Sequence, residues 1–169
     1  MKIACLSALA LLLSLLLGLT SCAPKVRLFA YMDEGLETVL SGELCGVPYT
    51  AMLRGEARAS ATARACDFTL TYLSPESLAG VTVTYRAATD EVTLSLGTLS
   101  GMGTADTLLA APGLLLLSER AAHTVTKNAD GTLTVTTDDG ASRLLAADGR
   151  PLALVRVSDG RQVQVKVGR

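Results

Sequence analysis

From Thr50 onward, apolar and polar side chains alternate with a period of two, which is the pattern of half-buried β-strands. Phe68, Leu70 and Tyr72 share one face, and threonines occupy the other. Valine and threonine at this density favour a pleated sheet over a helix. The pattern predicts strands near residues 36–45, 48–56, 64–73, 81–87, 91–97, 122–128, 132–138, 141–147, 151–158 and 161–168.

Asp-Gly pairs separate the later strands, and Asp-Gly between alternating runs is a strong hairpin signal. These pairs are Asp130-Gly131, Asp139-Gly140, Asp148-Gly149 and Asp159-Gly160. The C-terminal part of the chain is therefore predicted to be an up-and-down antiparallel meander. Residues 57–65 have no clear period and are predicted to be a loose connection, and Gly101 to Gly103 ("GMG") are predicted to form a turn.

Two segments interrupt the strand pattern. In "LSPESLAG", Ser74 is a candidate helix cap, Pro75 suits the first helical position and Gly80 ends the turn, so one short helical turn is expected. Residues Thr104 to Arg120 ("TADTLLAAPGLLLLSER") are the candidate for a longer helix, which Pro112-Gly113 would kink or split.

The predicted sheet is much wider than the predicted helix. About ten strands at about 4.8 Å spacing would span about 48 Å, whereas a packed helix covers about 10 Å. The sheet could curl around its helix and leave an apolar trough, fold over into a sandwich, or meet a partner. If it forms a trough, the residues expected to line it are Val81, Val83, Tyr85, Val92, Leu94, Leu96, Leu114 and Leu117.

The N-terminus has the layout of a secretory signal. Met1-Lys2 is a short basic start, and the leucine-rich run from Ala4 to Thr20 is shorter than the roughly 20 residues that a membrane span needs. The run ends in "LTSC", which resembles the bacterial lipobox, so Cys22 is expected to carry diacylglycerol and to anchor the chain. The expected organisation is a signal at 1–21, a lipidated N-terminus and short tether at 22–35, and one antiparallel β domain at 36–169.

The charge of the chain bears on its partners, and its size bears on what it needs to fold. The chain has 169 residues with 15 basic and 16 acidic side chains, and loss of Lys2 with the signal leaves a net charge of about −2. A single domain of this size needs no metal or disulfide to fold. No basic patch points to a nucleic acid.

Cys45 and Cys66 remain beside Cys22 once the signal is removed. An exported pair is a candidate disulfide. In a meander, however, they would lie at opposite ends of the sheet, about 26 Å apart, whereas a disulfide requires a Cα separation below about 7 Å. The pattern favours two buried thiols and leaves the bridge open.

The sequence shows no catalytic or metal-binding constellation. His123 is the only histidine, and it has no second histidine or cysteine at ligand spacing. There is no G-x-S-x-G motif for a serine nucleophile. We therefore expect neither an enzyme nor a cofactor.

The lipobox, the run of exported antiparallel strands, the unit "FTLTYLSPESLAGVTV" and the leucine-rich helix inserted among the strands together resemble the LolA/LolB-type lipoprotein-carrier fold, and especially the clostridial-type lipoproteins that share it. The resemblance covers roughly Leu36 to Val167. It implies a mainly β (α+β) fold, in which a curved antiparallel half-barrel is closed by one or two short helices over a cavity that holds acyl chains.

Two functions follow as expectations. The first is a non-enzymatic lipoprotein, anchored on the extracytoplasmic face of the cell membrane or in the outer membrane of a diderm host, which binds an apolar ligand or a lipoprotein acyl moiety. The second is a structural or interaction lipoprotein in envelope or spore assembly, with a protein partner and no small-molecule ligand.

Overall fold

The computed structural model describes residues 28–60, 63, 65–104, 107–116, 123–137, 141–158 and 161–168. The signal segment and Cys22 lie outside the described residues. The described elements are α2 (Tyr31–Glu34), β1 (Leu36–Leu44), β2 (Val47–Gly55), β3 (Phe68–Ser74), β4 (Thr82–Arg86), β5 (Glu91–Leu96), β6 (Leu99–Thr104), the 3₁₀ helix η2 (Leu108–Leu116), β7 (His123–Lys127), β8 (Leu133–Thr137), β9 (Ser142–Leu145), β10 (Pro151–Ser158) and β11 (Arg161–Val167).

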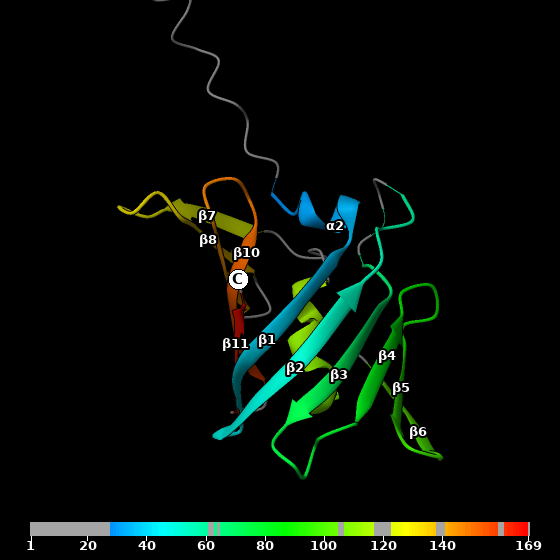
Figure 1. Cartoon of the computed structure of the whole chain (residues 1–169). Helices are drawn as coiled ribbons and strands as arrows, with labels where there is room; N and C mark the ends of the chain where they lie inside the picture. Colours follow the sequence, from blue (N-terminus) through cyan, green and yellow to red (C-terminus); the bar gives the residue numbers. More distant parts are fainter. Residues whose placement is uncertain are drawn as a thin grey trace, which may run out of the picture.

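The described strands form one 11-stranded sheet in the order β6-β5-β4-β3-β2-β1-β11-β10-β9-β8-β7. It consists of two meanders, β1 to β6 and β7 to β11, joined where β1 pairs antiparallel with β11 (Figure 1). Leu40 pairs with Val167 at one end of this seam, and Leu44 pairs with Val163 at the other. The predicted C-terminal meander is confirmed.

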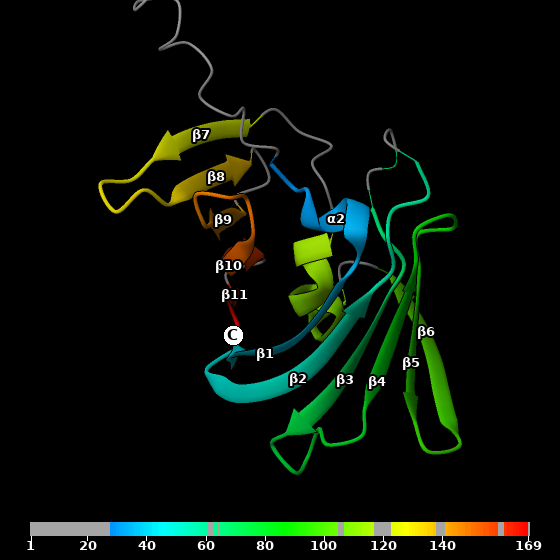
Figure 2. The same cartoon turned by 45° about the horizontal axis from the view of Figure 1, so that its top comes forward.

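The sheet curls around η2 (Figure 2). Because β6 and β7 are the two outer strands, the chain that connects them must cross the whole width of the sheet. It crosses on the concave side, where η2 contacts β1, β3, β4, β10 and β11. The expected curved half-barrel with a helix on its concave face is therefore confirmed.

Strand alternation determines which side chains meet η2. On β3, Phe68, Leu70 and Tyr72 are buried on the concave side, while Thr69 and Thr71 face outward. The other strands repeat this division with their own apolar positions. The largest fully buried side chains are Tyr72, Tyr85, Met32, Leu40, Leu53, Leu70, Leu115, Leu145, Leu154, Val83 and Val92.

Two local predictions were wrong. Residues Gly101 to Gly103 lie in strand β6, paired along β5 from Leu96↔Leu99 to Glu91↔Thr104, and do not form a turn. Their backbone groups gain ladder hydrogen bonds that a turn would not supply. The expected helix over 104–120 is a 3₁₀ helix limited, among the described residues, to Leu108–Leu116, with Pro112 inside it.

The turn after β3 is present, but Ser74 does not cap it. Leu78 N–H and Ala79 N–H donate to the Pro75 carbonyl, which closes the turn. The Ser74 hydroxyl instead lies 2.7 Å from the Thr50 hydroxyl and accepts a hydrogen bond from Thr50 N–H at 3.1 Å. This contact lies at the irregularity in the β2–β3 pairing, between Thr50 and Ala51. A cross-strand partner therefore replaces the predicted local one.

The segment before β1 packs into the core from residue 28 onward. Phe29, Tyr31 and Met32 are buried in and beside α2. Arg58 N–H donates to the Met32 carbonyl at 2.8 Å, and Arg58 Nε donates to Asp33 at 2.5 Å. These bonds attach α2 to the segment that follows β2.

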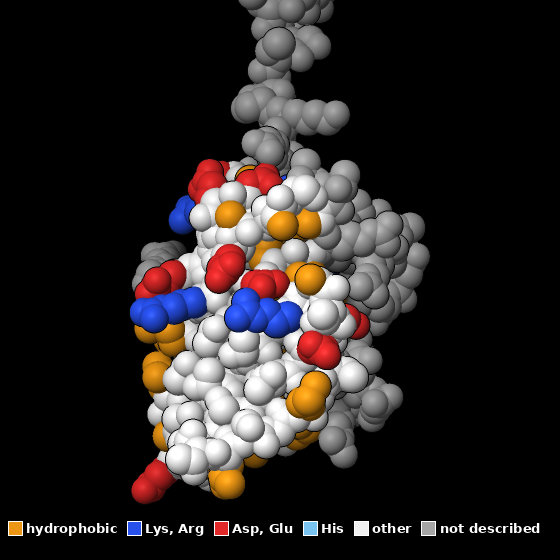
Figure 3. Space-filling model, turned by 90° about the vertical axis from the view of Figure 1, so that its right-hand side faces the viewer, with side chains coloured by type: hydrophobic (Ala, Val, Ile, Leu, Met, Phe, Trp, Pro, Cys, Tyr) orange, Lys and Arg blue, Asp and Glu red, His pale blue; other side chains and the backbone are white. Residues whose placement is uncertain are grey.

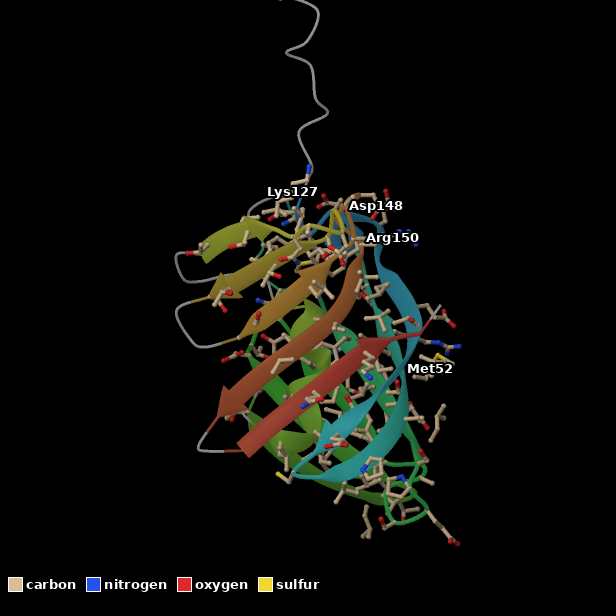
Figure 4. The ribbon with its side chains drawn as sticks, turned by 90° about the vertical axis from the view of Figure 1, so that its left-hand side faces the viewer. Met52, Lys127, Asp148 and Arg150 are labelled. Atoms are coloured by element: carbon tan, nitrogen blue, oxygen red, sulfur yellow. The ribbon has the colours of Figure 1, made fainter. Side chains whose placement is uncertain are left out.

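Charged side chains lie at the end of the sheet that α2 occupies. Figure 4 shows Lys127, Asp148 and Arg150 at this end, and Met52 projecting from the outer side of β2. Arg150 Nε donates to Asp148 at 2.7 Å across the turn between β9 and β10. Both side chains are largely exposed, so the pair contributes little to stability.

Candidate functional site

An open apolar groove lies beside the edge strand β6, at the end of the sheet opposite α2. Its cavity volume is about 200 Å³. Its lining comes from the hairpin β5–β6, from the residue before β4 and from the first turn of η2. Figures 1 and 2 show where β4, β5 and β6 lie in the sheet. The lining residues are Val81, Leu94, Ser95, Leu96, Leu99, Ser100, Gly101 and Leu109.

Three of the predicted lining residues, Val81, Leu94 and Leu96, meet in this groove. Leu96 remains 49% exposed, so its side chain is accessible to a ligand. Three others, Val83, Tyr85 and Val92, are covered by the protein's own core. Leu117 and the side chain of Leu114 lie outside the described residues.

Leu99, Gly101 and Leu109 belong to the groove but were not predicted. Leu99 is 73% exposed and shares the concave side of the sheet with Leu96, its partner in the β5–β6 register. Gly101 pairs with Leu94, and a Cβ built on Gly101 would meet no atom within 4 Å. The alternation of β5 continues into the β6 sequence "LSGMGT", and this could have predicted the strand. Two of its concave positions are glycines, which have no side chain to show the alternation.

Tyrosine hydroxyls hold η2 near its two ends, from β3 at one end and from α2 at the other. The Tyr72 hydroxyl donates to the Leu109 carbonyl at 2.8 Å, and the Tyr31 hydroxyl donates to the Leu115 carbonyl at 2.7 Å. Between them, the ring of Phe68 lies against the backbone of Gly113, where any side chain would collide with it. The helix is therefore fixed along the concave face, and Leu109 is held at the inner wall of the groove.

The aromatic side chains belong to the core and not to the groove. Phe68 stacks on Tyr85 with ring centroids 5.1 Å apart, and Tyr49 meets Tyr72 edge-on at 5.6 Å. Burial raises the pKa of Tyr49 and of Tyr72 above the ordinary value. Both phenols therefore stay protonated at neutral pH and act as hydrogen-bond donors.

Arg143 on β9 is buried on the concave side, which the sequence analysis did not predict. Its cross-strand neighbours are Val135 and Leu154, and its guanidinium lies 5.9 Å from the ring centroid of Phe29. A cation over an aromatic face is a stabilising contact. Arg143 thus links the C-terminal meander to the segment that precedes β1.

Cys45 and Cys66 do not form a disulfide. Cys66 is buried, and its thiol donates to the Met32 carbonyl at 3.6 Å, whereas Cys45 is exposed in the β1–β2 turn. The expectation of two buried thiols is correct for Cys66 and wrong for Cys45. Cys45 and Gly46 both have positive φ, as the two central residues of a type I′ hairpin turn do, and Cys45 is exposed at this turn.

A second pocket, of about 320 Å³, lies on the convex face across the ends of β2, β3 and β4. Arg54 pairs with Glu37 at 3.1 Å, and Arg86 pairs with Asp67 at 2.9 Å. The basic groups of this pocket therefore already have carboxylate partners. Figure 3 shows charged side chains gathered across the middle and upper part of this face, whereas its lower part is mainly uncharged.

Within the described ranges, no group of three or more His, Cys, Asp or Glu side chains is placed to hold a metal ion. Of the helices that the structure describes, none combines the length and apolarity that crossing a bilayer requires.

Comparison with known proteins gives distant likenesses of fold only. No protein-family model matches the sequence, and no curated protein matches it. An uncharacterised conserved protein from Thermus thermophilus is similar in structure, with a TM-score of 0.46 and 17% identity over 80% of this chain and 76% of that chain.

Two further structures are similar at a TM-score of 0.43. One is a domain assigned to outer membrane lipoprotein sorting from Vibrio parahaemolyticus, with 9% identity over 79% of this chain and 83% of that chain. The other is the LolA superfamily protein NE2245 from Nitrosomonas europaea, with 7% identity over 86% of this chain and 87% of that chain. At these scores, the likenesses carry no functional argument.

Proposed function

We propose that this chain is a non-enzymatic, extracytoplasmic lipoprotein, anchored to the membrane through lipid on Cys22, that holds an apolar chain such as an acyl group in the groove beside β6. The observation that carries the proposal is the groove itself. Its side chains are aliphatic or hydroxyl-bearing, with no ionisable group among them, and Leu96 and Leu99 on its rim remain exposed to water. Covering such leucines is favourable only for an apolar ligand.

The size of the groove limits how strongly it can bind alone. Full burial of a leucine contributes about 1.5–3 kcal/mol, and the two rim leucines are already partly covered. A gain of about 4 kcal/mol corresponds to a dissociation constant of about 1 mM. The volume of about 200 Å³ is also below the roughly 300–1,000 Å³ of ordinary ligand pockets. The groove therefore accommodates part of an acyl chain, and tighter retention requires further contacts.

The proposed anchor and the groove belong to opposite ends of the domain. Leu28 is the first described residue and lies at the α2 end, while the groove lies beside the β5–β6 turn. The six residues from Cys22 to Arg27 span at most about 20 Å when extended. A lipid on Cys22 would hold the α2 end near the membrane, and the groove would open away from it.

Photo-crosslinking tests the ligand. The full chain, processed by a bacterial host in its own membranes, is incubated with the uncharged methyl ester of a diazirine-bearing palmitic acid and irradiated, and the labelled peptides are mapped by mass spectrometry. We expect adducts on the peptides that contain Leu94 to Gly101 and Leu109. Leu99→Lys should reduce this labelling at least ten-fold, since it places a charge on the groove rim.

Met102→Lys is the matched control. Met102 lies on the same strand and is 78% exposed, but it faces the convex side, so labelling of the groove should persist. Equal labelling of the wild type and Leu99→Lys would refute the groove as the ligand site. The anchor is tested separately: the N-terminal peptide should carry the mass of diacylglycerol on Cys22, and Cys22→Ala should abolish it.

The interaction lipoprotein remains a second candidate. It is favoured by a different observation, the uncovered edge strand β6.

A further inference from the structure

Strand β6 is a regular edge of the sheet. All six of its residues, Leu99–Thr104, follow β5 in continuous register, and the pairing shows no bulge. Among the described strands, its other side has no partner, because β6 is the first strand of the sheet order. Thr104 already uses its N–H and its carbonyl on Thr107, so the backbone groups available for a further strand lie in Leu99 to Gly103.

Natural sheets usually block such edges with charges, prolines, bulges or short strands, because an open edge pairs with other chains. The sequence of β6, "LSGMGT", contains no charged residue and no proline. The opposite edge strand β7, "HTVTK", includes Lys127 and is one residue shorter. The two edges of the same sheet thus differ in protection.

Strand β6 exposes one large apolar side chain on each face of the sheet. Leu99 on the concave side is 73% exposed, and Met102 on the convex side is 78% exposed, the two highest values among the large apolar side chains that the structure describes. Between them, Gly101 leaves open space on the concave side. A neighbouring strand would cover both side chains and would have room for a bulky residue opposite Gly101.

We propose that β6 is a docking edge for an extended, uncharged segment of a partner polypeptide, which adds to the sheet as a further strand and places a bulky apolar side chain opposite Gly101. Main-chain hydrogen bonds supply the attraction in this mode, and the side-chain positions supply the specificity. The inference does not depend on the groove holding an acyl chain, because it rests on backbone pairing.

Charge and size determine the kind of partner. No residue of β6 is charged, and the lower part of the convex face beside it is mainly uncharged (Figure 3), so a charged segment would lose hydration without gaining an ion pair. The edge is about 20 Å long, and pairing with one strand of that length buries much less surface than the roughly 1,200–2,000 Å² of a stable dimer interface. An extended segment fits this edge, whereas a second copy of the whole domain would gain too little contact area from it.

The probe is a fluorescent nine-residue peptide without charged side chains, Ser-Thr-Val-Thr-Phe-Thr-Val-Thr-Ser, in two forms. One form is unmethylated, and the other is N-methylated on every internal residue. An added strand pairs with β6 through the N–H groups of one of its two edges, so the unmethylated form keeps these hydrogen bonds and the methylated form has no edge that can donate. We expect the unmethylated form to bind the full purified chain in an anisotropy titration at least ten-fold more tightly than the methylated form.

Two variants locate the binding. Met102→Lys should weaken binding of the unmethylated peptide at least ten-fold, while Val125→Lys, the same change at an exposed position on the opposite edge strand β7, should leave it unchanged. Fatty-acid labelling of the groove should persist in Met102→Lys, which separates this result from the acyl-binding proposal. Equal binding of the two peptide forms, an equal effect of Val125→Lys, or self-association of the chain that Met102→Lys abolishes would each overturn the proposal.

Discussion

Gly42 of β1 leaves open the space into which the backbone carbonyl of Gln164 from β11 projects. A Cβ on Gly42 would lie 1.8 Å from the Gln164 carbonyl oxygen. The contact lies in the β1–β11 seam, where Gly42 pairs with Val165 and Glu43 pairs with Gln164. The seam that joins the two meanders therefore has no room for a side chain at this position.

Gly42→Ala should destabilise the domain by about 3 kcal/mol. Overpacking of a core commonly costs about 1–3 kcal/mol, and a backbone atom moves away less readily than a side chain. The measurement is the midpoint of urea unfolding followed by circular dichroism. The control is Gly101→Ala, whose new methyl group would meet nothing within 4 Å. Equal stabilities of the two variants would contradict the close approach at the seam.

Tyr31→Phe should lower the free energy of unfolding by about 1–2 kcal/mol. The change removes the hydroxyl that lies 2.7 Å from the Leu115 carbonyl and leaves this acceptor buried without that donor. Tyr49→Phe is the matched control, since its hydroxyl lies 3.4 Å from the Gln164 carbonyl and its loss should cost less than about 0.5 kcal/mol. Chemical denaturation of both variants compares them. A larger loss in Tyr49→Phe would show that the tyrosine hydroxyl does not hold η2.

Gly101→Val should stabilise β6 by about 0.5–1 kcal/mol, because valine favours a strand more than glycine does and this position has space for it. The same side chain enters the groove between Leu94 and Leu99. The midpoint temperature of thermal unfolding should therefore rise, while fatty-acid photo-labelling of the groove should fall. Met102→Val, on the convex side of the same strand, should leave the labelling intact. Full labelling of Gly101→Val would exclude this groove.

Asp67→Asn should remove part of the acid sensitivity of the fold. Burial alone would raise the pKa of Asp67, but hydrogen bonds from Arg86 at 2.9 Å and from the Ala87 N–H at 2.8 Å outweigh it and hold the pKa below the ordinary value. A lowered pKa in the folded state means that the carboxylate stabilises the fold above the unfolded-state pKa of about 3.9. This contribution disappears as the pH falls through the folded-state pKa.

Since Arg86 is largely exposed, we expect a loss of only about 1 kcal/mol for Asp67→Asn at pH 7, and a smaller loss at pH 2. Urea titrations at both pH values measure it. Asp148→Asn, at an exposed turn, should show no comparable change. A loss of stability in Asp67→Asn that is the same at pH 7 and at pH 2 would contradict a stabilising role for the ionised Asp67 carboxylate.

Cys66 should resist alkylation in the folded chain, whereas Cys45 should react promptly. Burial raises the pKa of the Cys66 thiol to about 11, so little thiolate forms at pH 8, and its side chain is inaccessible. Iodoacetamide treatment followed by peptide mass spectrometry should label Cys45 alone under native conditions and both residues in 6 M urea. Native labelling of Cys66 at the rate of Cys45 would show that α2 does not cover it.

The sequence by itself determined the strands and most of their turns. Alternation with a period of two is a local property, because successive side chains of a strand point to opposite faces whatever the strand pairs with. The buried set Phe68, Leu70 and Tyr72 could therefore be predicted from spacing alone. Asp130-Gly131 and Asp148-Gly149 lie in the turns that they predicted, since the turn conformation depends on the residues in the turn. Asp139-Gly140 and Asp159-Gly160 lie outside the described residues.

Only the tertiary structure decided what joins the two meanders and what covers the curved face. The β1–β11 seam pairs residues more than a hundred positions apart, and no local pattern in Leu40 or Val167 distinguishes this partner from another edge. Strand β6 was missed because its concave positions include Gly101 and Gly103, which become strand residues through pairing with β5 and not through their own propensity. The groove follows from these long-range placements: η2 reaches one edge of the sheet with Leu109, and β6 supplies the outer wall with Leu99.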